Sequence, residues 1–140
     1  GQIPQLLRSH GIQPTSQRVE IAHVLFENCG QQADRPNEHL SADAVLERVN
    51  ADYPRVSKAT VYNTLRLFEE TGLVRAVVVS ASKVFYDANT DPHHHVFDEA
   101  SGELHDLPAE EIDVSQLMPR LPHGAAAEDL DIVVRIRQSS

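Results

Sequence analysis

The stretch 57–87 constrains the fold of this chain more than any other. Ser57 is a residue type that caps helices, and Gly72 stands where a helix takes a left-handed stop residue. Between them the apolar residues recur at i, i+4 and i+7, the spacing of a buried helical stripe: Val61, Leu65 and Phe68. Two β-branched or aromatic stretches, 73–79 and 83–87, follow at once and predict a hairpin. A helix that leads into a hairpin is typical of a winged helix.

Two further helices are predicted before this one. In 15–28 apolar residues recur at helical spacing behind Thr15, which is a cap candidate. Ser41 is expected to cap the next helix, and a short lead-in at 5–10 is also compatible with a helix. Three helices followed by a hairpin are the order of a winged helix-turn-helix, which we assign to residues 1–88.

Residues 89–140 predict a different architecture. A second hairpin is expected over 96–107, a short helix over Ala109–Met118, and a final strand with alternating apolar residues over 130–136. A small α/β unit with an edge strand is a natural surface for pairing with a second copy of the chain. The predicted fold class is therefore α+β, with an N-terminal winged helix-turn-helix followed by a small α/β dimerisation domain.

Polar residues on the third helix form a face that is suited to DNA. Lys58, Tyr62 and Arg66 are four residues apart, and Asn63 is adjacent. Lys and Arg suit phosphates, Asn suits an adenine edge, and a Tyr ring suits a thymine methyl group. A polar helix face that simply meets water has the same pattern, and it is the hairpin after the helix that favours DNA. The predicted DNA-contacting residues are Arg18, Lys58, Thr60, Tyr62, Asn63 and Arg66.

The charge distribution permits DNA binding without indicating it. The formal net charge is −9, whereas phosphate contacts need Lys and Arg. The acidity is concentrated late in the chain, because residues 1–80 carry eight basic and nine acidic side chains, and residues 81–140 carry four and twelve. The first half can therefore present a basic face, and the second half is rich in carboxylates that can hold cations.

A run of three histidines, His93-His94-His95, indicates a metal site. In an extended segment His93 and His95 point the same way and His94 points the opposite way, so one face offers two imidazoles. Carboxylates and a further imidazole on either side of the run complete the candidate ligand set: His39, Asp87, His93, His95 and Asp106. Nitrogen and carboxylate ligands without thiolate suit Fe(II), Mn(II) or Zn(II). A metal held by both halves would fix their relative orientation; the alternative is a solvated run or a residual affinity tag.

A series of short motifs runs along the chain: GIQPTSQR at 11–18, HLSA at 39–42, SKATVYNTL at 57–65, GLV at 72–74, KVFYD at 83–87, the histidine run, and the ending 130–137. Together they resemble the Fur family of metal-dependent regulators from Leu7 to Arg137. The resemblance implies a transcription regulator rather than an enzyme. It also implies a homodimer with winged-helix domains, and double-stranded DNA with an AT-rich palindrome as its partner.

The family's functional residues carry over in part. Its regulatory metal site falls on the five candidate ligands named above, and its base-contacting tyrosine falls on Tyr62. The next position, often Arg in the family, is Asn63 here. The family's structural zinc site uses two CxxC pairs, but Asp98 and Ser101 occupy the first pair's positions and the chain's single cysteine is Cys29. The chain is therefore expected to fold without that zinc.

The missing cysteines, the HHH run and the ending DIVVRIR at 131–137 most resemble the iron response regulator branch. That branch responds to haem or iron status, which implies control of iron homeostasis genes and a haem site at His93, His94 and His95. A peroxide-sensing regulator with bound Fe(II) or Mn(II) is the second interpretation, because Asp at positions 87 and 106 resembles that branch.

Two other classes of function have less support: an enzyme and a protein-binding module. Two His and a carboxylate also serve non-haem iron oxygenases, but five ligands would fill the shell, and we find no Gly-rich phosphate loop. The other reading is a winged helix that binds protein rather than DNA. The longest apolar run is far shorter than a membrane span, and the N-terminus lacks a signal-peptide pattern. We therefore expect no membrane association and a cytoplasmic protein.

Overall fold

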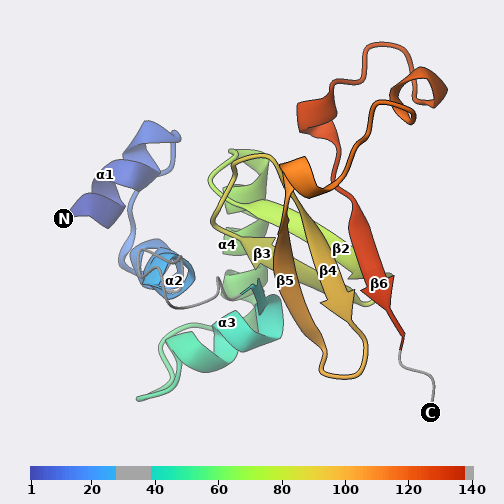
Figure 1. Ribbon diagram of the computed structural model, residues 1–140. Helices are drawn as coiled ribbons and strands as arrows, with labels where there is room; N and C mark the ends of the chain where they lie inside the picture. Colours follow the sequence, from blue (N-terminus) through green and yellow to red (C-terminus); the bar gives the residue numbers. More distant parts are fainter. Residues whose placement is uncertain (28–38, 138–140) are drawn as a thin grey trace. The chain divides into compact units, whose positions relative to one another are not determined.

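The computed structural model describes residues 1–27 and 39–137, which form two compact units, Gly1–Thr90 and Asp91–Ser140 (Figure 1). The boundary lies two residues after the one expected between 88 and 89. Cys29 and the polar stretch that follows it lie outside the described residues. Each unit is considered by itself below.

The first unit combines helices with one small antiparallel sheet. Its helices are α1 (Gln2–Ser9), α2 (Ser16–Glu27), α3 (Ala42–Val49) and α4 (Lys58–Glu70). Its strands are β1 (Leu40–Ser41), β2 (Arg75–Ser80) and β3 (Lys83–Asp87), in the order β1-β3-β2. The predicted helices and the hairpin after α4 are confirmed, so the unit has the element order of a winged helix-turn-helix.

The ends of α3 and α4 are formed by the capping residues that the sequence predicted. The Ser41 hydroxyl accepts a hydrogen bond from the Ala44 N–H at the start of α3, and the Ser57 hydroxyl accepts one from the Thr60 N–H at the start of α4, both at 3.2 Å. After α4 the chain turns at Gly72 with φ of 79°, a left-handed conformation that costs glycine little. Both ends of the predicted recognition helix are therefore encoded locally.

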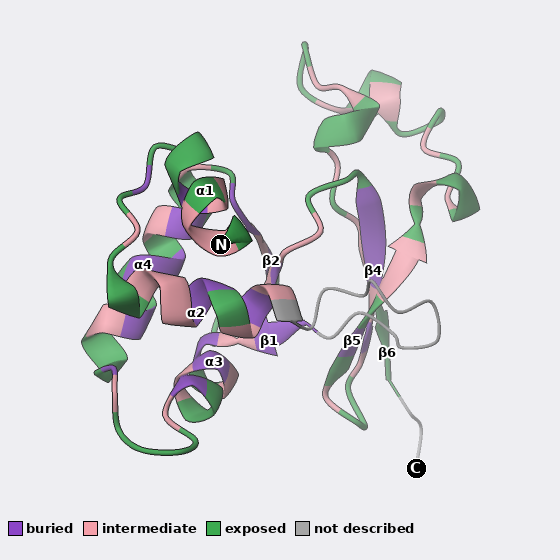
Figure 2. Ribbon diagram, turned by 90° about the vertical axis from the view of Figure 1, so that its left-hand side faces the viewer, coloured by how far each residue is buried: buried purple, intermediate pink, exposed green. Residues whose placement is uncertain are grey.

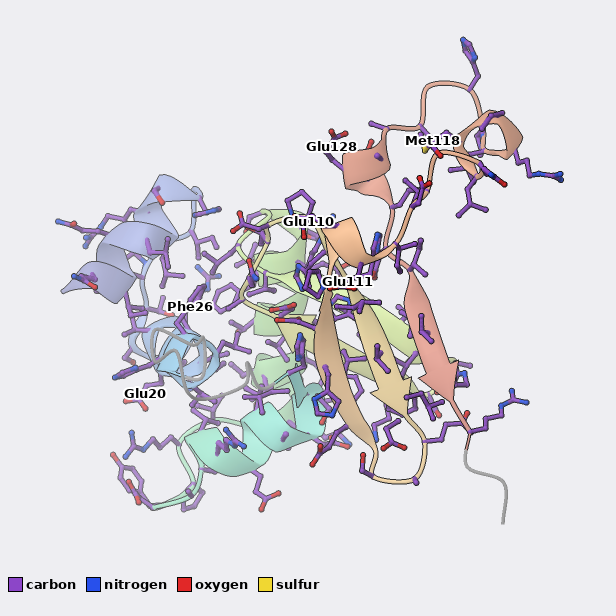
Figure 3. All side chains as sticks on the ribbon, in the orientation of Figure 1. Glu20, Phe26, Glu110, Glu111, Met118 and Glu128 are labelled. Carbon is purple, nitrogen blue, oxygen red and sulfur yellow. The ribbon has the colours of Figure 1, made fainter. Side chains whose placement is uncertain are left out.

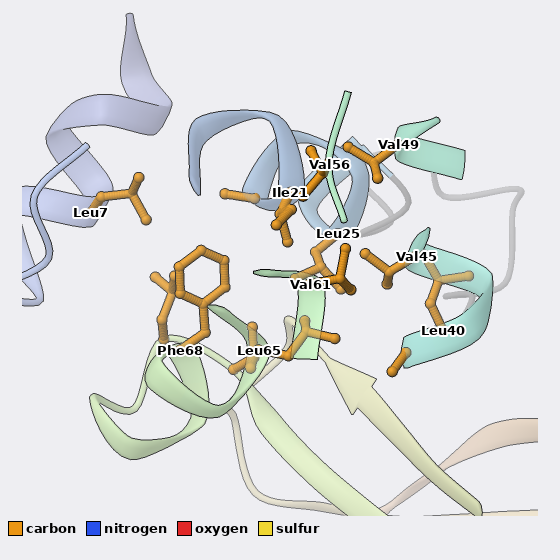
Figure 4. Packing of buried hydrophobic residues seen from close by; sticks show 14 of the residues in the cluster. Leu7, Ile21, Leu25, Leu40, Val45, Val49, Val56, Val61, Leu65 and Phe68 are labelled. Atoms are coloured by element: carbon orange, nitrogen blue, oxygen red, sulfur yellow. The ribbon is translucent and has the colours of Figure 1, made fainter. Parts of the chain in front are cut away.

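The core of the first unit lies between the helices (Figure 4). Val61, Leu65 and Phe68 on α4 are fully buried, as their spacing predicted. They meet apolar residues from the other three helices, among them Leu7, Ile21 and Val45. This packing leaves the opposite face of α4 exposed.

The second unit is a three-stranded sheet with a long, irregular connection. Its strands are β4 (His93–Asp98), β5 (Glu103–Pro108) and β6 (Val133–Ile136), in the order β5-β4-β6. β4 is antiparallel to β5 and parallel to β6. The histidine run lies inside the central strand, which begins earlier than the expected start at 96, and most of β4 is buried (Figure 2).

The predicted helix over Ala109–Met118 is wrong. That region contains only short 3-10 turns, η1 (Ala109–Glu111) and η2 (Met118–Arg120), and a third, η3 (Ala127–Asp129), follows before β6. Glu110 and Glu111 lie on η1 (Figure 3), and none of the three turns contains a buried residue. A short helix needs a packed apolar face to offset the cost of nucleation, and this segment has none within its own unit.

In the described part of the chain, no helix combines the length and apolar character that crossing a membrane would require.

Candidate metal centre and nucleic-acid interface

The first unit brings His39 and Asp87 together. β1 pairs with β3 in the register Leu40 to Tyr86, so the residues just before and just after that pair stand opposite each other. His39 Nε2 lies 3.0 Å from Asp87 Oδ2, and both side chains are buried. The other oxygen of Asp87 accepts a hydrogen bond from the Asn89 N–H at 2.9 Å. This unit therefore contains one imidazole and one carboxylate of the predicted ligand set, held by strand pairing.

The second unit brings His93, His95 and Asp106 together. The two histidines lie on one face of β4, with ring centroids 4.5 Å apart, and Asp106 is paired with His95 across the β4–β5 register. Asp106 Oδ1 lies 3.0 Å from His93 Nε2 and 3.7 Å from His95 Nε2. Both Nε2 atoms thus converge on one carboxylate oxygen, which is the donor arrangement that a divalent cation needs.

Hydrogen bonds on the other ring nitrogen assign the tautomer of these two histidines. His93 Nδ1 lies 2.6 Å from the Asp91 carbonyl oxygen, and His95 Nδ1 lies 3.1 Å from Asp131 Oδ1. A carbonyl or carboxylate oxygen can only accept, so Nδ1 must carry the proton in both rings. In a neutral His95 ring the Nε2 lone pair is then available to a metal. At His93, where Nε2 lies 3.0 Å from Asp106 Oδ1, two lone pairs face each other unless a cation lies between them.

His94 has the opposite arrangement. Its Nδ1 accepts a hydrogen bond from the Ile132 N–H at 3.0 Å, so in the neutral ring the proton is on Nε2. The side chain is only 4% exposed and, by strand alternation, faces away from His93 and His95. His94 therefore ties the segment before β6 to the central strand.

Asp131 is a neighbour of the site that sequence reasoning missed. It precedes β6, 36 positions after His95 in the chain, yet its carboxylate contacts the His95 ring. The available signal was an acidic residue within the alternating apolar stretch 130–136. The parallel β4–β6 register that brings it to His95 cannot be predicted from one sequence.

The predicted DNA-contacting residues lie in the first unit, on α4 and at the start of α2. Lys58, Tyr62, Asn63 and Arg66 are exposed on α4. The Lys58 ammonium lies 5.6 Å from the centre of the Tyr62 ring, close enough for a cation–π contact. α4 thus presents the cationic, amide and aromatic groups that suit a DNA groove.

The Tyr62 hydroxyl is held by α3. It donates a hydrogen bond to Asp43 Oδ1 at 2.9 Å, and this bond raises the pKa of the Tyr62 phenol. The phenol therefore stays protonated at neutral pH, and its ring is 39% exposed. Tyr62 and Asp43 line a groove together with Ser82 in the turn between β2 and β3 and Lys83 at the start of β3.

A second polar groove joins α2 to α4. Arg18, Thr60 and Asn63 line it together with Thr15, Gln17, Thr64 and Leu67. The Arg18 guanidinium donates a hydrogen bond to the Gln13 carbonyl oxygen at 3.1 Å. Hydroxyl, amide and guanidinium donors in one groove are the groups that contact DNA phosphates.

Comparisons with known proteins agree on one family. A model described as the Ferric uptake regulator family matches residues 9–135. The peroxide-responsive repressor PerR of Staphylococcus aureus is 33% identical over 101 residues, or 72% of this chain. That match spans 63% of the repressor, less than two thirds of its length.

Two solved structures illustrate the likeness in fold. The ferric uptake regulator of Vibrio cholerae superposes with a TM-score of 0.75 at 21% identity, over 96% of this chain and 98% of that one. The peroxide stress regulator of Campylobacter jejuni superposes with a TM-score of 0.65 at 25% identity, over 97% and 96%.

Proposed function

This chain belongs to the ferric uptake regulator family, and on that premise we propose that it is a dimeric, DNA-binding transcription regulator whose affinity for DNA is set by a divalent metal. Members of the family are transcription regulators rather than enzymes, and they bind DNA and divalent metals. The finer assignments below, namely the ligand set, the metal and the DNA contacts, are our proposals.

The observation that carries the proposal is the division of the ligands between the two units. The second unit offers two Nε2 lone pairs and a carboxylate, and the first offers an imidazole and a carboxylate already 3.0 Å apart. Six chain steps separate Asp87 from His93, so their Cα atoms are never more than about 22 Å apart. We propose that one metal binds His39, Asp87, His93, His95 and Asp106, and that it thereby orders the two units for DNA binding.

The donor chemistry favours Fe(II), Mn(II) or Zn(II) over haem. Three imidazoles and two carboxylates suit these divalent ions. A haem held by the whole run would need a lone pair on His94, but in the neutral ring Nδ1 accepts from the Ile132 N–H and Nε2 carries the proton. Solved relatives are described with manganese, iron or zinc. We therefore propose a divalent metal as the ligand and, where that metal is Fe(II), control of iron homeostasis genes.

Peroxide sensing is the second candidate. It is favoured by the identity of 33% with a peroxide-responsive repressor and by aspartate at both proposed carboxylate positions, Asp87 and Asp106. If this candidate is right, peroxide will release DNA from the Fe(II) form and leave the Mn(II) form bound.

The test is a titration of the apo-protein with Mn(II), Zn(II), anaerobic Fe(II) and hemin, each followed by fluorescence anisotropy on a labelled AT-rich palindromic duplex. We expect a divalent metal to change the affinity for DNA, with two copies of the chain on each duplex. Equal affinity with and without every ligand would refute metal control. Binding to no duplex in any state would favour a protein-binding winged helix.

Replacing Tyr62 by alanine is expected to weaken binding to the specific duplex. The ring is exposed on α4, and one good base contact contributes about 1–3 kcal/mol, a factor of roughly 5 to 150 in affinity. Metal affinity should not change. Anisotropy and metal titration measure the two quantities, and Tyr53→Ala, an exposed tyrosine outside α4, is the matched control. Equal losses of DNA and metal affinity would mean that Tyr62 is a structural residue.

A further inference from the structure

We propose that Asp131 is a positioning residue for the metal site: its carboxylate holds the proton of His95 on Nδ1 and so directs the Nε2 lone pair to the metal. The inference rests on the proposed metal-binding function. It adds a residue that lies outside the five proposed ligands and acts through one of them.

His95 lies between two carboxylates. Asp131 Oδ1 is 3.1 Å from Nδ1, and Asp106 Oδ1 is 3.7 Å from Nε2. The ring itself is fully buried, and the Asp131 side chain that contacts it is 31% exposed. With Asp131 accepting from Nδ1–H, the two ring nitrogens have different roles, one as a hydrogen-bond donor and the other as a metal ligand.

The backbone around Asp131 is tied to β4 independently of its side chain. The Ile132 carbonyl oxygen accepts a hydrogen bond from the His95 N–H, and the Ile132 N–H donates to His94 Nδ1, both at 3.0 Å. Val133 is then the parallel-register partner of His95. Asp131 is therefore presented to the ring by a fixed strand segment, and truncating its side chain leaves these contacts in place.

The comparison with His93 explains why a carboxylate matters here. The Nδ1–H of His93 is held by the Asp91 backbone carbonyl, two residues away in the same chain segment. The Nδ1–H of His95 is held by a side chain from another part of the second unit, which carries a negative charge when ionised. A charged acceptor makes a stronger hydrogen bond than a neutral one and further stabilises an imidazole bound to a cation.

The test uses Asp131→Ala, Asp131→Asn and, as a control, Asp129→Asn, which changes an exposed acid at the end of η3. Long-range ¹H–¹⁵N NMR of the apo-protein reports the His95 tautomer, and Co(II) titration reports affinity and the visible spectrum of the bound ion. Circular dichroism checks that each variant is folded.

In the wild type we expect His95 as the Nδ1–H tautomer. Asp131→Ala should populate the other tautomer, weaken Co(II) binding by about 10–100-fold and alter the spectrum. Asp131→Asn retains an acceptor oxygen, so it should keep the tautomer and lose less affinity. Asp129→Asn should resemble the wild type in every measurement.

Three results would overturn the inference: an unchanged tautomer in Asp131→Ala, an unchanged Co(II) affinity in that variant, or equal losses in the alanine and asparagine variants. Failure of the proposed function gives a different result: the wild type would bind no Co(II), or would bind DNA equally well with and without it, while the NMR of the apo-protein still reported the tautomer.

Discussion

Mn(II) affinity is expected to fall by at least about 100-fold when Asp106 is replaced by alanine. Its Oδ1 is the atom on which the Nε2 atoms of His93 and His95 converge. Losing an outer partner of a ligand already costs about 10–100-fold, so losing a proposed ligand should cost more. The Asp106 side chain is 28% exposed, so its removal should not leave a large cavity in the core. Calorimetric Mn(II) titration measures the loss, and anisotropy should show that DNA affinity no longer responds to metal.

Glu103→Ala is the matched control for this variant. Glu103 is an acid on the same strand, β5, with its side chain 66% exposed and paired with His105. Its removal should leave Mn(II) affinity within about twofold, since exposed ion pairs contribute little.

The double variant His93→Ala with His95→Ala should also abolish the response of DNA affinity to metal, while its circular dichroism remains that of a folded protein. Wild-type affinity in Asp106→Ala would remove Asp106 from the ligand set.

Replacing Phe68 by alanine is expected to lower the free energy of unfolding of the first unit by about 3–5 kcal/mol. Phe68 is fully buried among residues from the four helices, and domains of this size are stable by only about 5–15 kcal/mol. The chain has no tryptophan, and its three tyrosines all lie before residue 90. Tyrosine fluorescence during urea unfolding therefore measures this unit specifically.

The control for the core variant is Val78→Ala, an apolar residue of β2 that is 62% exposed. It should change the free energy of unfolding by less than about 0.5 kcal/mol. A loss below about 1 kcal/mol in Phe68→Ala would mean that α4 is not held by this core.

Local rules account for much of the first unit. The caps at Ser41 and Ser57, the left-handed stop at Gly72 and the buried stripe of α4 depend on residues within a few positions of one another. The same holds for His93 and His95, because strand alternation alone puts them on one face. These features could be predicted because the interactions that produce them have short sequence separation.

The features that were predicted wrongly or missed depend on contacts between residues that are far apart in the chain. The helix expected over Ala109–Met118 satisfied local rules, but the short 3-10 turns in its place bury no residue. The partner of His95 at Asp131 and the structural bond of His94 both depend on β6 lying parallel to β4, a pairing across more than thirty residues.

Short-range periodicity and residue chemistry were enough to predict the helices of the winged unit and the polar face of α4, because the interactions that form them are local. Only the tertiary structure shows which ring nitrogen donates or accepts a hydrogen bond in His93, His94 and His95. It also shows that Asp131 contacts the His95 ring. The two tautomers of a neutral histidine are close in energy, so the hydrogen-bond partners of the ring decide between them. Here the pairing of β4 with β6, which are far apart in the chain, brings those partners to the rings of His94 and His95.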